Sequence, residues 1–157
     1  MGQRRPRLLP LVGPLVVAES ADDQAALSAV TALYASDEAI LQLGVTVDRV
    51  GVGSVELAFT PGSDKGNGHG IVHGGYLFLL ADTAFAYAFA SRGSNGVTVN
   101  ASIDFLAPAR VGTRLTARAS EFHRDGGTGI YDVRIADEDG RTIAVFRGHG
   151  RVPRGQH

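Results

Sequence analysis

Residues 76–90 read YLFLLADTAFAYAFA, an apolar run that is interrupted only by Asp82 and Thr83. The run follows His73-Gly74-Gly75 and stops at Ser91-Arg92-Gly93. Fifteen residues are too few to cross a bilayer as a helix, and an ionised carboxylate is costly to bury. The pattern therefore predicts a buried helix in which Asp82 has either a charge partner or a chemical role.

Strand patterns surround this helix on both sides. Alternation at Val45 and Val47, and again over residues 55–59, predicts two strands joined near residues 51–53. Four alternating segments follow the helix, separated by turn residues such as Asp139-Gly140, at residues 97–107, 113–123, 129–137 and 141–149. This order predicts an α+β fold in which a curved antiparallel sheet wraps one long helix. Because the helix is apolar on nearly every side, we expect a second subunit to complete its cover.

Two shorter helices are expected before the first strand. Ser20 and the acidic residues after it are typical of a helix start. Apolar residues then recur at helical spacing, at Ala25, Leu27, Val30, Leu33 and Tyr34. Ser36 is expected to cap a second helix over residues 39–43, which ends at Gly44. Residues 61–75 are rich in glycine and predict a loop without regular structure.

The chain has 157 residues, a net charge of −1 and no cysteine. This size predicts one domain, over residues 20–157, and the charge argues against a nucleic-acid partner. The absence of cysteine excludes disulfides and a cysteine nucleophile, and it agrees with a cytoplasmic protein. His69 and His73 lie four residues apart in a glycine-rich stretch, which argues against a metal site. Residues 1–19 superficially match a signal peptide, but prolines and a glycine interrupt them, and we expect a flexible extension.

Gly74 and Gly75 stand where the long helix begins. Backbone N–H groups at a helix start have no partner inside the helix, and the helix dipole favours negative charge there. A thioester or ester carbonyl placed against these amides would gain an oxyanion hole. A simple helix start after a tight turn is the alternative.

Asp82 lies eight residues beyond Gly74, or about 12 Å along a helix. One chain therefore cannot bring both groups to the same carbonyl. Two antiparallel copies of the helix would place each Asp82 near the other copy's Gly74, which predicts a homodimer with two shared sites. A purely structural, hydrogen-bonded carboxylate is the alternative for Asp82.

A partly buried carboxylate has a raised pKa and is a better base near neutral pH. Asp82 could activate a water molecule or attack the carbonyl itself through an anhydride, and both routes remain open. Asn67 could orient the water or the substrate, or could simply form an Asn-Gly turn. His73 could cap the helix or act in catalysis. Thr83 could bind a water molecule or could be a packing residue.

Several motifs carry a family resemblance. The stretch NGHGIVHGGYLFLLADTAFAYA (residues 67–88), followed by IDFLAPARVGTRLTARA, TGIYDV and AVFRG, closely resembles the hotdog-fold acyl-CoA thioesterases. The chain looks most like the phenylacetic acid degradation branch (PaaI type), over roughly residues 36 to 152. The resemblance implies dimers, and usually homotetramers built from two dimers. It also implies hydrolysis of aryl-acyl-CoA thioesters such as phenylacetyl-CoA or hydroxyphenylacetyl-CoA, with no metal and no bound cofactor.

The same resemblance implies roles for single residues. Asp82 matches the general base or nucleophile, Gly74 the oxyanion amide, Asn67 the residue that orients water or the thioester, and His73 the family histidine beside that glycine. For the substrate, Phe78 could line an acyl pocket, although helix aromatics are usually core. Candidate partners for the phosphates of CoA are Arg110, Arg114 and Arg124, each of which could instead be an ordinary surface arginine.

Two other functions stay open. A hotdog hydratase or dehydratase would act on an enoyl- or hydroxyacyl-CoA thioester, and that chemistry favours a well-placed histidine that the helix lacks. A non-catalytic acyl-CoA-binding protein would use the fold as a sensor, but residues 1–35 show no helix-turn-helix pattern. No nucleic-acid or membrane partner is expected.

Overall fold

The apolar run forms one long helix, α3 (Gly74–Ala90), in a computed structural model that describes residues 20–155. The expectations for residues 1–19 lie outside the described residues. His73 caps α3: its Nδ1 accepts a hydrogen bond of 2.9 Å from the backbone N–H of Gly75. The capping role considered for His73 is therefore confirmed.

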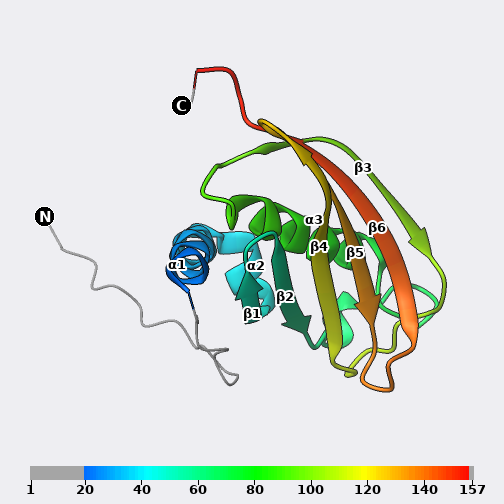
Figure 1. Cartoon of the computed structure of the whole chain (residues 1–157). Helices are drawn as coiled ribbons and strands as arrows, with labels where there is room; N and C mark the ends of the chain where they lie inside the picture. Colours follow the sequence, from blue (N-terminus) through cyan, green and yellow to red (C-terminus); the bar gives the residue numbers. More distant parts are fainter. Residues whose placement is uncertain (1–19, 156–157) are drawn as a thin grey trace, which may run out of the picture.

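One antiparallel sheet curves around α3 (Figure 1). Its strand order is β1-β2-β4-β5-β6-β3. The predicted strands are confirmed, with bounds β1 (Thr46–Gly51), β2 (Ser54–Phe59), β3 (Val97–Phe105), β4 (Leu115–Asp125), β5 (Thr128–Ala136) and β6 (Thr142–Arg151). The fold is thus α+β, and the concave face of the sheet packs on the helix.

Phe85 and Phe89 of α3 pack against glycine residues of the sheet, which have no side chains. A Cβ atom at Gly148 would lie 2.7 Å from Phe85, and one at Gly150 would lie 2.8 Å from Phe89. Gly129 of β5 pairs with Gly150 and also faces Phe89. Both phenylalanines are almost fully buried, so the glycines let helix and sheet approach closely.

The N-terminal helices differ in detail from the sequence prediction. α1 (Ala21–Ser36) continues through Ser36, whose hydroxyl donates to carbonyl oxygens of its own helix. Asp37 caps α2 (Glu38–Leu43) instead, because its carboxylate reaches the N–H of Ile40 at 3.2 Å. The prediction that Ser36 is the cap was therefore wrong by one residue. Gly44 ends α2 in the left-handed conformation, with φ of 72°, as expected.

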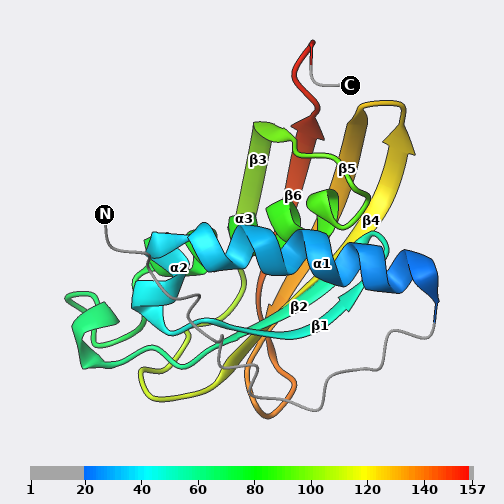
Figure 2. The ribbon, with the colours of Figure 1, turned by 90° about the vertical axis from the view of Figure 1, so that its left-hand side faces the viewer.

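The buried side of α1 agrees with the prediction at Val30 and Tyr34. It differs at Ala25, which is exposed, and Ala26 is buried instead. α1 lies across β1 and beside α3, so it covers one edge of the sheet (Figure 2). The loop that was expected over residues 61–75 ends at His73, because Gly74 and Gly75 belong to α3, and it contains one short 3-10 turn, η1 (Ser63–Lys65), where no element was expected.

The opposite edge of the sheet, β3, is open within the described residues. Val97, Val99 and Phe105 expose 50%, 53% and 54% of their surface. An apolar edge strand that exposes unpaired backbone groups is a template for pairing with another strand. The part of the chain that the structure describes therefore leaves β3 uncovered, and this strand is suited to an interface.

Candidate active site

The first turn of α3 offers one free backbone amide. Within residues 20–155, the N–H of Gly75 is taken by His73, whereas the N–H of Gly74 has no acceptor. A Cβ atom at Gly74 would lie 3.1 Å from the ring of Phe105, at the end of β3. Gly74 is therefore the candidate oxyanion donor, and Gly75 serves the cap.

Asp82 is half-buried two turns along α3. Its Oδ1 accepts a hydrogen bond of 3.4 Å from the hydroxyl of Thr98, at the start of β3. Burial raises the pKa of the Asp82 carboxyl above its ordinary value, and the hydrogen bond from Thr98 opposes this rise. The carboxyl therefore has the environment of a general base. Thr98 was missed from the sequence, because nothing local marks a threonine sixteen residues away as a partner.

Thr83 and Phe78, which were considered for substrate binding, have other contacts. The hydroxyl of Thr83 donates to the carbonyl oxygen of Leu79 at 2.8 Å, and the side chain is buried. These contacts favour the packing interpretation of Thr83. Phe78 stacks edge-to-face on Phe146 with ring centroids 5.4 Å apart, and it keeps 36% of its surface exposed.

Asn67 shapes the loop that leads into α3. Its Oδ1 accepts hydrogen bonds from the N–H groups of His69 at 2.9 Å and Ile71 at 3.4 Å. The Asn-Gly turn considered from the sequence is therefore present, and the side-chain oxygen is used within the loop. The amide nitrogen is the part of Asn67 that can still donate to a substrate or a water molecule.

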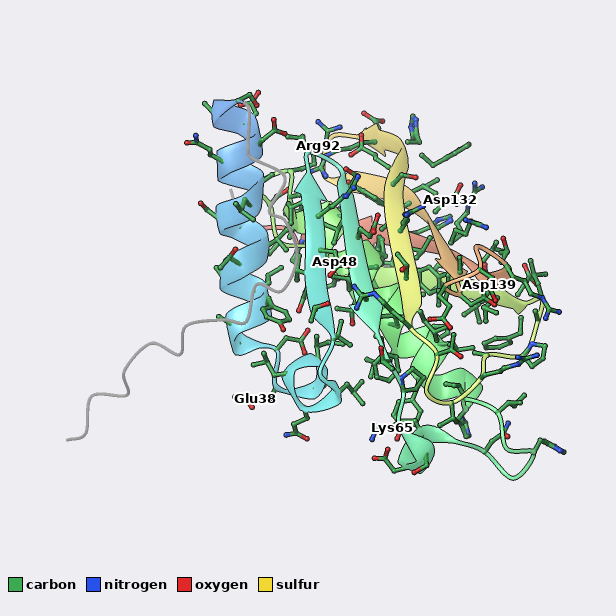
Figure 3. The ribbon with its side chains drawn as sticks, turned by 90° about the horizontal axis from the view of Figure 1, so that it is seen from below. Glu38, Asp48, Lys65, Arg92, Asp132 and Asp139 are labelled. Carbon is green, nitrogen blue, oxygen red and sulfur yellow. The ribbon has the colours of Figure 1, made fainter. Side chains whose placement is uncertain are left out.

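The candidate arginines do not gather in one chain. Arg110 pairs through its backbone with Ile71, just before α3, whereas the guanidinium of Arg124 lies 4.9 Å above the ring of Phe89, near the end of α3. Figure 3 shows these two ends, which are marked by Lys65 at one and Arg92 at the other. Arg114 forms an ion pair with Asp48.

No three histidine, aspartate or glutamate side chains of residues 20–155 lie together as a metal site requires.

The two ends of β3 lie beside the two main candidate groups, Asp82 and Gly74. Thr98, beside Asp82, and Phe105, beside Gly74, pair with Gly150 and Ala144 of β6. Asp82 is therefore tied to the start of β3 and Gly74 to its end.

None of the helices in the described part of the chain is long and apolar enough to cross a membrane.

Known proteins resemble this chain in sequence and in fold. Residues 69–144 match the Thioesterase superfamily. The acyl-coenzyme A thioesterase PaaI of Escherichia coli (strain K12) is 41% identical over 117 residues, which cover 74% of this chain and 84% of that protein.

Solved structures agree. A structure of the E. coli PaaI protein from the phenylacetic acid degradation operon superposes with a TM-score of 0.82 at 37% identity, covering 83% of this chain and 95% of that one. A hypothetical thioesterase of Streptococcus pneumoniae TIGR4, solved with coenzyme A, superposes with a TM-score of 0.67 at 28% identity, covering 69% and 87%. The predicted hotdog fold and the predicted thioesterase class are confirmed. The chain belongs to the thioesterase superfamily.

Proposed function

We propose that this protein hydrolyses aryl-acyl-CoA thioesters of the phenylacetyl-CoA type, at two sites that are each shared between the subunits of a homodimer. The observation that carries this proposal is the pair of contacts at opposite ends of β3: Asp82 with Thr98, and Gly74 with Phe105. Each contact lies within one chain, and the shared site forms only when two chains pair along β3.

The shared site follows from antiparallel pairing. If the open β3 edges of two chains pair antiparallel about the middle of the strand, the start of each β3 lies beside the end of the other. Asp82 of one protomer then lies on the side of Gly74 of its partner. The apolar exposure of Val97, Val99 and Phe105 supports an interface along this edge.

The reaction can be written through these two groups. Asp82 takes a proton from water as the water oxygen bonds to the thioester carbon, and the carbonyl electron pair moves to oxygen. The N–H of Gly74 stabilises that oxyanion. The carbon–sulfur bond then breaks, the thiolate receives the proton, and the products are free acid and CoA. Direct attack by the Asp82 carboxylate through an anhydride remains the alternative for the first step.

Two similar proteins support the proposed class of substrate. The name and source operon of the E. coli protein support a phenylacetyl-type acyl group. The coenzyme A in the S. pneumoniae relative supports a CoA thioester. Arg110 and Arg124 stand at opposite ends of α3, so the Arg110 of one subunit and the Arg124 of the other would lie toward the same end of a dimer. We assign them to the CoA phosphates and extend the assembly to a tetramer of two dimers, in the cytoplasm.

The test is release of free thiol from phenylacetyl-CoA, followed with a thiol reagent. Hydrolysis yields one free thiol for each acid formed. A hydratase or dehydratase would alter the acyl chain and leave the thioester intact, and a binding protein would leave the substrate unchanged. A full acyl-CoA panel without thiol release would contradict the proposal.

A further inference from the structure

A hollow of about 400 Å³ lies beyond Asp82, toward the end of α3. α3 supplies Ala86 and Ala90 to its wall, the end of α1 supplies Leu33, and the loop before β3 supplies Asn95. Figure 3 shows Glu38, which also lines the hollow, at the start of α2. The hollow is thus bounded by three separate segments.

The hollow is aligned with the candidate base. Ala86 and Ala90 follow Asp82 by one and two helical turns, so they lie on the same face of α3, about 6 and 12 Å further along. The loop that closes the hollow reaches Thr98, the partner of Asp82, three residues after Asn95. A group that is attached to a carbonyl at Asp82 and extends toward the end of α3 would reach this space.

Hydrogen bonds and apolar side chains fix the walls of the hollow. The hydroxyl of Tyr87 donates to the Asp37 carboxylate at 2.9 Å, which fastens the junction of α1 and α2 to α3. The other oxygen of Asp37 accepts from the N–H of Ile40. On the α3 side the two alanines leave room that larger side chains would fill, and Leu33 faces them as an apolar wall.

We infer that this hollow is the acyl subsite, and that Ala86, Ala90 and Leu33 determine the size of the acyl group. The inference rests on the proposed function. The volume stands at the low end of the range of small-molecule sites, roughly 300–1,000 Å³. The subsite has ample room for an acyl group with one aromatic ring, since a cavity of about 150 Å³ already holds benzene.

Ala90→Leu tests the far end of the subsite. The added branch enters the hollow where an aromatic ring would lie, and it leaves the space beside Asp82 open. We expect the ratio of kcat/KM for phenylacetyl-CoA to that for acetyl-CoA to fall by about tenfold or more. Ala35→Leu is the matched control, because Ala35 is exposed on α1 and lies outside the hollow, and it should leave the ratio unchanged.

Leu33→Ala tests the opposite wall in the opposite direction, and it keeps the inference testable if Ala90→Leu does not fold. Enlarging the hollow should raise kcat/KM for acyl groups bulkier than phenylacetyl relative to phenylacetyl itself. Circular dichroism and thermal melting verify that each variant is folded.

The inference and the proposed function fail in different ways. If the parent releases no thiol from any acyl-CoA, the proposed function is wrong. If the parent is active but folded Ala90→Leu and Leu33→Ala leave the selectivity ratios unchanged, or change all acyl groups equally, the subsite is elsewhere.

Discussion

The hydroxyl of Thr98 donates to the carboxylate of Asp82 at 3.4 Å, and this contact joins the first residues of β3 to the middle of α3. The carboxylate that interrupts the apolar helix is therefore held beside the open edge strand of the sheet.

Thr98→Val should move the acid limb of the pH profile. The Thr98 hydrogen bond lowers the pKa of Asp82, so its loss raises that pKa further. A base must be ionised to act, and the pH below which kcat/KM declines should therefore shift upward. Thr98→Ser keeps the hydroxyl and should keep the parent profile. An unshifted limb in folded Thr98→Val would contradict this positioning role.

Asp82→Asn should lower kcat for phenylacetyl-CoA by roughly 10²-fold or more, because the amide cannot accept the proton from water. Thiol release measures the loss. Asp22→Asn neutralises an exposed carboxylate at the start of α1, outside β3, and is the matched control, with kcat near the parent value. Parent-like turnover by Asp82→Asn would remove Asp82 from the mechanism.

The same Asp82→Asn variant should be more stable than the parent at neutral pH. Burial raises the pKa of Asp82 in the folded state, so its contribution to stability is fully present below the unfolded pKa and is lost as the pH rises through the folded pKa. The difference in melting temperature should be largest at neutral pH and should shrink toward acidic pH. A parent that is more stable than the variant at neutral pH would show that the ionised carboxylate is well compensated.

Gly148→Ala should destabilise the fold by about 1–3 kcal/mol, because the new methyl group would lie 2.7 Å from the buried ring of Phe85. Chemical denaturation measures the change. Gly68→Ala is the control, since a Cβ atom there meets nothing within 4 Å. Equal stability of the two variants would mean that helix and sheet do not pack as closely as described.

Val99→Lys should prevent dimer formation, because it places a charge on the open β3 edge, where Val99 is 53% exposed. Sedimentation velocity measures the assembly, and the resulting monomer should lose thiol release with it. Val145→Lys changes an exposed valine of β6, one strand inside that edge and paired with Asp104 of β3, and should still form the dimer. A Val99→Lys variant that stays dimeric would place the interface elsewhere.

Much of the fold follows from local pattern. Strand alternation, the Asp139-Gly140 turn and the apolar run around Asp82 are all readable in the chain, because each depends on neighbours in sequence. The cap at Asp37 was displaced by one residue, because Ser36 and Asp37 are both good caps and only packing decides between them.

The site was less accessible from sequence. Thr98 approaches Asp82 only after the chain has turned into β3, and the hollow beside Ala86 needs α1 in place as a wall. The hydroxyl of Thr83 looked available beside Asp82, but the helix directs it to the carbonyl of Leu79. These relationships depend on tertiary contacts that spacing alone does not encode.

Complementation between two damaged chains tests the shared site most directly. Asp82→Asn removes the base, and Gly74→Val obstructs the oxyanion amide, so each homodimer should be nearly inactive. In a mixed dimer, one site carries both changes and the other carries neither. Equal mixing by co-refolding should therefore restore about a quarter of the parent thiol release. If differently tagged chains co-purify as mixed dimers and activity stays at the level of the separate variants, Asp82 and Gly74 do not act across the subunit boundary.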